Sequence, residues 1–317
     1  MAARDQVEIR DGVELKHLDG ELFDGAGVTK RDLVDYLDAV ADRILPELHD
    51  RPLTVLRARP GQQPFMQKNL PSYAPDWIPT TTVWAQASQR EVRYPLCEDR
   101  RTLVWFAGQR AVEFHPTVLD LRARVTHLVL DLDPPEGAAF ADVVHAAHLV
   151  HETLAGGGLR GAVKTSGSKG IHVIVPAVSS TSVEDAMAAT RALAARTERL
   201  DPAAVTTAFI KEDRRGKVFV DPTRSGGASL ACAYSPRARP GVPVSFPVGW
   251  GALDDVRPGD FTILTAPGLL GDRDPWREQM PAPQALPRNL VEEGHAIPVP
   301  RVAAMHEGKR RARARRG

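Results

Sequence analysis

Apolar residues recur at helical spacing in three segments of the chain. Each segment starts or ends with residues that are typical of a helix boundary. The predicted helices are residues 33–44, which follow the N-cap residue Thr29 and end near Pro46, residues 143–154, which three glycines close, and residues 183–199, which follow the N-cap residue Ser182.

Shorter apolar runs between these segments favour β-strands. Strands with intervening helices predict an α+β fold with mixed or antiparallel sheets, and no internal repeat is visible. The proline-rich stretch from Pro275 to Pro300 is typical of extended packing or of a linker rather than of another domain. The strands predicted in the first half of the chain are Leu53–Arg57, Thr80–Ala85, Thr102–Ala107 and Ala111–Phe114.

Two aspartates follow a buried strand in the run Leu128-Val-Leu-Asp-Leu-Asp-Pro-Pro135. Because side chains alternate between the faces of a strand, Asp131 and Asp133 point the same way at its carboxyl end, where the prolines stop the pairing. Carboxylates this close repel each other, and a hard divalent cation such as Mg²⁺ or Mn²⁺ relieves the repulsion. The alternative is a pair of loop aspartates that face water.

A second polar run, Val163-Lys-Thr-Ser-Gly-Ser-Lys-Gly-Ile-His172, leads into an apolar strand. Its small residues, Ser166 and Ser168 among them, allow close backbone approach and offer N–H and hydroxyl groups to an anion. Lys169 adds a positive charge, and the ring of His172 can donate to a phosphate oxygen. The run lacks P-loop spacing, so a Walker-type ATPase is not supported, and an ordinary hairpin turn is the alternative.

A third strand, Lys217-Val-Phe-Val-Asp221, again ends in a carboxylate that a proline follows. Taken alone, Asp221 is typical of a turn residue. Together with Asp131 and Asp133 it completes a set of carboxylates that can bind two divalent cations, one at a 3′ hydroxyl and one at a triphosphate. The three runs therefore predict a site for phosphoryl transfer.

The composition is that of an ordinary globular protein of 317 residues, of which 43% are hydrophobic and 26% charged. No apolar stretch is long enough for a membrane span, and the amino end lacks the apolar core of a signal peptide. We therefore expect a cytoplasmic location and no membrane partner. Cys97 and Cys232 are too few for a disulfide scaffold or a cysteine-rich zinc site.

Basic residues concentrate at the carboxyl end of the chain. Residues 309–317 hold six lysines and arginines and no acid, so residues 1–308 carry 35 basic and 40 acidic residues, a net charge of −5. We expect residues 1–300 to form one domain and residues 301–317 a basic, disordered tail that neutralises phosphates in a salt-dependent manner. A terminus that merely aids solubility is the alternative.

The three polar runs together resemble those of the archaeo-eukaryotic primase superfamily, specifically the polymerase domain of bacterial DNA ligase D and its stand-alone relatives. The resemblance covers residues 8–270, and further matches in the same order are Arg51-Pro-Leu-Thr54, Phe65-Met-Gln-Lys-Asn69, Ala74-Pro-Asp-Trp77, Val112-Glu-Phe-His-Pro116 and Tyr234-Ser-Pro-Arg-Ala-Arg-Pro240. It implies two facing sheets flanked by helices. It also implies a template-directed nucleotidyltransferase, a DNA-directed polymerase or primase that extends DNA 3′ ends at short gaps or double-strand breaks, prefers ribonucleotides and commonly works better with Mn²⁺.

The resemblance also implies roles for individual residues. Asp131, Asp133 and Asp221 would bind two Mn²⁺ or Mg²⁺ ions. Alone, a histidine before a proline is as often a partly buried imidazole, but here the family places it near the sugar or phosphates. The residues expected to hold the incoming NTP or dNTP are Ser166, Ser168, Lys169, His172, Arg237 and His115.

DNA contacts are implied for a further set of basic and aromatic residues, in which the chain departs from its relatives at three points. Gly20 stands where many relatives carry a second lysine for a 5′ phosphate, and Met66 where an aromatic is common. After Asp221 the chain reads Pro222-Thr-Arg-Ser-Gly226 instead of Trp-Ser-Gln-Asn, which indicates a stand-alone or divergent branch. The expected DNA-binding residues are Lys30, Phe65, Lys68, Arg214 and Arg215.

The implied partners are gapped or broken DNA at the nucleoid, nucleotides, a DNA ligase and an end-binding protein such as Ku. Two other classes of protein stay open. A glycosyltransferase also uses an Asp-x-Asp motif to hold Mn²⁺, but it does not require the serine-rich run or the third carboxylate. A noncatalytic module that bridges DNA ends is the second alternative, and the intact set of carboxylates argues against it.

Overall fold

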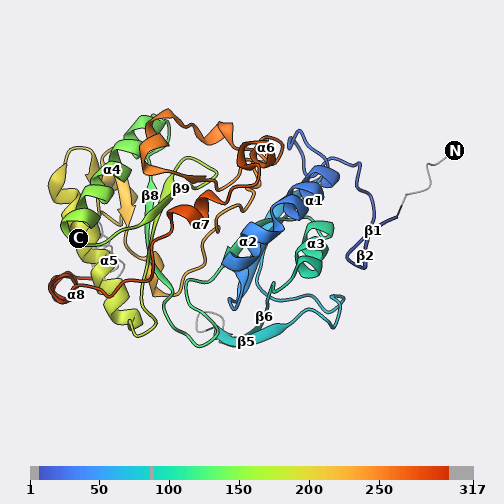
Figure 1. Cartoon of the computed structure of the whole chain (residues 1–317), viewed down its shortest axis with the longest axis horizontal. Coiled ribbons are helices and arrows are strands. Elements are labelled where there is room, and N and C mark those ends of the chain that lie inside the picture. Colours follow the sequence, from blue (N-terminus) through green and yellow to red (C-terminus); the bar gives the residue numbers. More distant parts are fainter. Residues whose placement is uncertain (1–6, 86–88, 300–317) are drawn as a thin grey trace, which may run out of the picture.

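The computed structural model describes residues 7–85 and 89–299, which form two lobes side by side (Figure 1). The predicted tail, residues 301–317, lies outside the described residues. No helix in the described ranges has the length and apolar character that a membrane crossing requires.

A mixed sheet of six strands forms the centre of one lobe, in the order β11-β12-β8-β10-β9-β13. Strands β11 and β12 run parallel, and every other neighbouring pair is antiparallel. Helices α4 (Phe140–Gly156) and α5 (Val183–Leu200) lie against each other and pack on this sheet (Figure 1). The strands are β8 (His127–Asp133), β9 (Ala162–Thr165), β10 (Ile171–Pro176), β11 (Val205–Thr206), β12 (Val218–Asp221) and β13 (Pro247–Val248).

The other lobe contains a three-stranded antiparallel sheet in the order β4-β3-β7, with three helices packed beside it (Figure 1). Two short antiparallel hairpins, β1-β2 and β5-β6, belong to the same lobe. The elements are β1 (Glu8–Arg10), β2 (Val13–Leu15), α1 (Lys30–Ala39), α2 (Ala41–Leu48), β3 (Leu53–Arg59), β4 (Gln62–Gln67), β5 (Thr80–Ala85), β6 (Arg90–Pro95), α3 (Arg100–Gly108) and β7 (Ala111–Pro116).

One segment, residues 228–236, connects the two sheets. The amides of Leu230 and Cys232 donate to the β7 carbonyls of Pro116 and Phe114, each at 3.2 Å. From the other side, Lys164 Nζ on β9 donates to the carbonyl of Ala231 at 2.8 Å. The two sheets therefore face each other across this segment, in agreement with the predicted fold.

Local signals in the sequence set the ends of the predicted helices. Thr29 caps α1 in a reciprocal capping box with Asp32, and Ser182 accepts from the amide of Asp185 at 3.0 Å at the start of α5. Helix α4 ends at Gly156, as its glycines indicate. The first helix differs from the prediction, because it breaks at Val40 and a second helix, α2, then includes Pro46.

The predicted strand Thr102–Ala107 is wrong, since these residues form helix α3. Asp99 caps the helix by accepting from the amide of Thr102 at 2.7 Å. All six residues of the run are buried, so they show neither the period of a half-buried strand nor that of an amphipathic helix. The cap residue was the signal that distinguishes the two.

The proline-rich stretch is not simply extended, because it contains two helices and packs on the lobe that holds the six-stranded sheet. An added Cβ on Gly294 of α8 would lie 1.8 Å from the carbonyl oxygen of Ala188 on α5, so the two helices touch backbone to backbone. Arg191, which is buried, donates to the carbonyl of Gly294. The remaining short elements are η1 (Lys211–Arg214), η2 (Arg224–Gly226), η3 (Trp250–Asp255), η4 (Pro258–Asp260), α6 (Ala266–Leu270), α7 (Pro275–Gln279) and α8 (Arg288–Ala296).

Candidate active site

Four polar side chains form a row across neighbouring strands of the six-stranded sheet. In the register of the antiparallel pairs, Asp131 of β8 lies opposite Asp221 of β12 on one side and His172 of β10 on the other. His172 in turn lies opposite Lys164 of β9. Because directly paired residues point to the same face of a sheet, two carboxylates, an imidazole and an ammonium group stand side by side.

An arginine lies between the two carboxylates of this row. Arg224 Nε is 3.2 Å from Asp131 Oδ2 and 3.2 Å from Asp221 Oδ2. The other oxygen of Asp221 accepts from the amide and the hydroxyl of Thr223, at 2.8 and 2.6 Å. Burial alone would raise the pKa of Asp131, but its neighbours His172 and Arg224 outweigh burial and lower the pKa to about 2.

The third predicted carboxylate, Asp133, is two residues further along β8 and is held by other cations. Lys169 Nζ is 3.2 Å from its Oδ1, and Arg214 Nη1 is 3.3 Å from its Oδ2. The guanidinium of Arg214 also packs over the ring of Phe219, at 3.8 Å from the centroid. The three carboxylates thus divide into a pair around Arg224 and a single group between Lys169 and Arg214.

The serine-rich run forms a tight loop between β9 and β10. Ser166 Oγ accepts from the amides of Ser168 and Gly170, at 3.2 and 3.1 Å, so these two N–H groups stabilise the loop itself. Gly167 has a φ of +68°, and an added Cβ there would lie 2.6 Å from the side chain of Arg237. Gly170 lies close to β8, since a Cβ added there would be 2.4 Å from the Leu132 carbonyl oxygen. Glycine at both positions is therefore required by close approach.

Lys164 fixes the proton of His172. Its Nζ contacts His172 Nδ1 at 2.8 Å, the Ala231 carbonyl at 2.8 Å and Ser245 Oγ at 2.5 Å. Ser245 donates its own proton to the carbonyl of Thr165, so it accepts from Lys164. The three protons of an ammonium group thus match three acceptors, and His172 Nδ1 is one of them.

While Lys164 is protonated, the ring proton of His172 therefore sits on Nε2, which faces Asp131 Oδ1 at 3.4 Å. Burial, followed by the charge of Lys164, lowers the pKa of His172 to about 4, so its ring is neutral at pH 7. Burial likewise lowers the pKa of Lys164 to about 7. A neutral imidazole with its N–H toward the carboxylates has a proton to donate, and its donation to a phosphate oxygen stays a prediction.

A buried glutamate positions two more of the predicted residues. Glu113 Oε2 lies 2.7 Å from His115 Nε2 and 3.1 Å from Arg237 Nε, and its Oε1 accepts from the amide of Ala238 at 3.0 Å. Arg237 also donates to the carbonyl of Ser166. Although burial opposes ionisation, His115 and Arg237 lower the pKa of Glu113 to about 2.

Many of these groups line a polar cavity of about 260 Å³. Asp221 is absent from the lining and lies behind Arg224, which does line it. The predicted residues that line the cavity are His115, Asp131, Asp133, Ser166, Ser168, Lys169, His172 and Arg237. Sequence reasoning assigned no role to Lys164, Glu113, Arg224 or Arg239. The position of Glu113 two residues before His115 on one strand was a usable signal, because residues i and i+2 share a face.

The predicted DNA-binding residues lie outside the cavity lining. Phe65 of β4 and Lys68 just after it are exposed, and Arg57 stacks over the Phe65 ring at 5.9 Å. Arg215 is exposed next to Arg214, beside Asp133. Lys30 is not a solvated lysine at a helix start. It is buried, and its Nζ donates to the Lys16 carbonyl at 2.7 Å.

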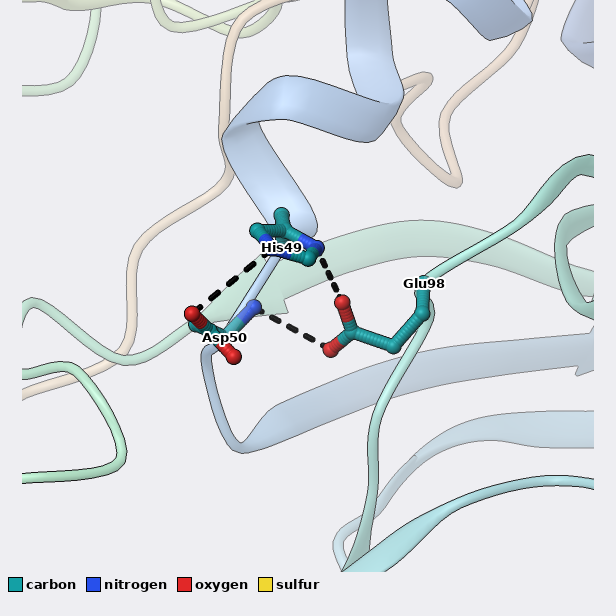
Figure 2. A group of neighbouring side chains, drawn as sticks. All are labelled: His49, Asp50 and Glu98. Atoms are coloured by element: carbon teal, nitrogen blue, oxygen red, sulfur yellow. Dashed lines mark hydrogen bonds and ion pairs between the residues drawn. The ribbon is translucent and has the colours of Figure 1, made fainter.

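A separate group of acidic and histidine side chains lies where α2 ends and β3 begins (Figure 2). Of the residues the structure describes, His49, Asp50 and Glu98 form the one set of three such ligand atoms within 4.8 Å of one another. The amide of Asp50 donates to Glu98 at 3.1 Å, and His49 pairs with both carboxylates (Figure 2). His49 and Asp50 are exposed, and none of the three lines the cavity.

The fold and the site are those of a known domain family. Residues 29–276 match the family model described as LigD, primase-polymerase domain. The chain therefore belongs to the LigD primase-polymerase domain family, which confirms the resemblance inferred from the motifs and argues against a glycosyltransferase.

Named relatives come from several bacteria. The multifunctional non-homologous end joining DNA repair protein LigD of Mycobacterium tuberculosis H37Rv is 35% identical over 256 residues, which are 77% of this chain and 34% of the relative. The bifunctional non-homologous end joining protein LigD of Bacillus subtilis 168 is 30% identical over 268 residues, 83% of this chain and 43% of the relative. The chain thus spans less than half the length of these relatives.

A solved structure, the polymerase domain from Mycobacterium tuberculosis ligase D in complex with DNA, has the same fold. It superposes with a TM-score of 0.77 and 32% sequence identity, and the match covers 84% of this chain and 97% of that one. The family and the fold are therefore established by sequence and by structure.

Proposed function

We propose that this chain is a template-directed nucleotidyltransferase of DNA repair that adds nucleotides, ribonucleotides in preference, to DNA 3′ ends at short gaps or double-strand breaks. The observation that carries the proposal is the row Asp221, Asp131 and His172 in register on one face of the sheet. It combines the two kinds of group that phosphoryl transfer needs, carboxylates for divalent cations and a neutral donor for phosphate.

The carboxylates suit divalent cations by their chemistry and placement. Asp131 and Asp221 each direct one oxygen to a shared positive group, Arg224 Nε, so the pair already accommodates a cation. Asp133 stands two residues along the same strand. Mn²⁺ or Mg²⁺ bound by these three residues would activate the 3′ hydroxyl and neutralise the triphosphate. The family relation to DNA polymerases and the hard oxygen ligands favour these ions over Zn²⁺.

The positive groups around the cavity suit the triphosphate. Lys169 and Arg237 line it with their charges, and Glu113 holds Arg237 in place through a 3.1 Å ion pair. His172, which also lines the cavity, offers a neutral N–H group. Together they would bind the β- and γ-phosphates and orient the α-phosphate toward the 3′ end.

A 5′ phosphate of gapped DNA would bind near the amino-terminal helix. The side chain of Arg110 fills the place of the lysine that many relatives carry, because its Nη2 lies 3.7 Å from where a Cβ on Gly20 would be. Burial, with the charge of Arg110 as a second cause, lowers the pKa of Lys30 to about 8. Arg110 Nη1 donates to the carbonyls of Glu21 and Leu22. Its positive charge beside Lys30 would attract an anion, so Arg110 would compensate for Gly20.

Primer extension tests the proposal most directly. Wild-type protein is assayed on gapped and overhanging DNA with NTPs or dNTPs and with Mg²⁺ or Mn²⁺. We expect Asp131→Ala and Asp133→Ala each to lower extension by about a thousandfold or more, because cation binding supplies several kcal/mol of transition-state stabilisation. DNA affinity, measured by fluorescence anisotropy, should stay largely intact.

Asp50→Ala, in the exposed group of Figure 2, serves as the matched control and should extend primers normally. If both cavity variants retain extension, the metal assignment is wrong. If the wild-type protein joins or holds DNA ends but extends none of these substrates, a noncatalytic bridging module is the better interpretation. A ligase and an end-binding protein such as Ku are proposed as partners because the family resemblance implies them.

A further inference from the structure

Each carboxylate of the Asp131–Asp221 pair has one oxygen held by the protein and one given to Arg224. Asp221 Oδ1 is fixed by Thr223, and Asp131 Oδ1 faces His172 Nε2 at 3.4 Å. The remaining oxygens, Oδ2 of each residue, both meet Arg224 Nε at 3.2 Å. The oxygens that point to a shared centre are therefore the ones that the guanidinium occupies.

Arg224 neutralises a repulsion that would otherwise be unscreened. The side chains of Asp131 and Asp221 are only 13% and 9% exposed, so water shields them poorly from each other. One guanidinium between two such carboxylates offsets that repulsion. A divalent cation at the same oxygens would do so as well, and the cation and the guanidinium would repel each other there because both are positively charged.

Arg224 is also able to leave. Its side chain is 40% exposed, far more than those of the two aspartates, and it lines the cavity. Thr223 would keep its hydrogen bonds to Asp221 after the guanidinium moves. The cavity offers the displaced group a polar environment next to Lys169 and Arg237, where an anionic triphosphate would bind it.

We propose that Arg224 is a built-in counter-cation that competes with the divalent cation for Asp131 and Asp221, and that its displacement couples metal binding to nucleotide binding. The inference rests on the proposed function of the site. Without nucleotide, the cation must expel Arg224 with no compensation, and its affinity is low. With nucleotide, the expelled guanidinium gains a phosphate partner, and the affinity for the cation rises.

The test measures Mn²⁺ binding to the full chain by the electron paramagnetic resonance of free Mn²⁺, with and without a nonhydrolysable UTP analogue. Arg224→Ala and Arg224→Gln should each bind Mn²⁺ about tenfold more tightly without nucleotide, which corresponds to roughly 1.4 kcal/mol. The gain in Mn²⁺ affinity on adding the analogue should be smaller in both variants than in the wild type. Circular dichroism checks that each variant is folded. Two variants are used so that the test still has an outcome if one of them folds poorly.

Arg239→Ala is the matched control, since it removes the same charge from the cavity lining without touching the carboxylate pair. Unchanged or weaker Mn²⁺ binding by the Arg224 variants would overturn the inference, as would an equal gain in Arg239→Ala, which would indicate a general effect of charge. Asp131→Asn separates this inference from the proposed function. If that variant binds Mn²⁺ like the wild type, the metal site itself is misplaced, whatever Arg224 does.

Discussion

At the scale of single residues, a buried lysine determines how the site presents its histidine. Lys164 donates to three acceptors, so it is satisfied without a carboxylate partner, which is unusual for a lysine that is 1% exposed. Its contact with Nδ1 leaves His172 with its proton on Nε2, toward the row of carboxylates. In the proposed function, Lys164 would act on substrate only through His172, as a positioning residue.

Lys164→Met tests this role. The thioether chain has similar length but no donor, so His172 Nδ1, the Ala231 carbonyl and Ser245 each lose a partner. We expect kcat for extension to fall between about ten- and hundredfold, as is common when a residue behind a functional histidine is removed. Stability should also fall, because each unsatisfied buried group costs roughly 1–3 kcal/mol.

Nitrogen-15 NMR of His172 distinguishes positioning from mere stability. In the wild type the spectrum should show the Nε2–H tautomer, and in Lys164→Met this preference should be lost while circular dichroism shows a folded protein. Lys16→Met, an exposed lysine, is the control. A variant that keeps both the tautomer and the rate would show that Lys164 has no influence on His172.

The site residues predicted from the sequence share one property, which is that neighbouring residues in the chain indicate their role. Asp131, Asp133 and Asp221 each end an apolar run, and the glycines and serines of residues 166–170 are consecutive. Lys164 and Arg224 were missed because their roles arise from strand register and from the path of the chain after β12. Register is set by pairing between distant segments, which a single sequence does not specify.

At the scale of elements, three strands of the lobe with the three-stranded sheet were predictable and one buried helix was not. β5 matches its predicted bounds, Thr80–Ala85, and β3 and β7 extend theirs by two residues. Residues 102–107, buried on all sides, were assigned to a strand because an apolar run of that length has no period to read. The group proposed to compensate for Gly20 also comes from far along the chain, since Arg110 lies in the turn between α3 and β7.

Arg110→Ala tests whether this turn and the start of α1 form a 5′-phosphate site. We expect the preference for gapped DNA with a 5′ phosphate over a 5′ hydroxyl to fall about tenfold, because a charged hydrogen bond to phosphate is lost. Binding of the two DNAs is compared by anisotropy, so that any general loss of structure cancels in the ratio.

Gly20→Lys in the Arg110→Ala background is the restoring variant. The backbone at Gly20 does not lie in the left-handed region, and the vacated arginine leaves room for the new side chain. The preference for the 5′ phosphate should return. A preference that Arg110→Ala leaves intact would refute the assignment.

At the scale of the whole molecule, overall charge does not favour the proposed binding of DNA. Residues 1–308 carry a net charge of −5, so they repel a polyanion on average, and the proposed DNA contacts would come from local groups such as Lys30 with Arg110, Lys68, and Arg214 with Arg215. Six basic residues in the segment 309–317 add the strongest concentration of positive charge in the sequence. The row of Asp221, Asp131, His172 and Lys164 is distant from this segment in sequence.

Deletion of residues 309–317 should therefore weaken DNA binding at low salt and flatten its dependence on salt. If all six basic residues neutralise phosphates of duplex DNA, the slope of log affinity against log salt should decrease by roughly 5, about 0.9 for each residue. A variant with all six replaced by glutamine keeps the length of the chain and should behave like the deletion. The rate of extension at saturating DNA should change little, because none of the residues around the cavity is altered. An unchanged salt slope in both variants would show that the segment does not contact DNA, and the local groups of the two lobes would then carry the whole electrostatic attraction.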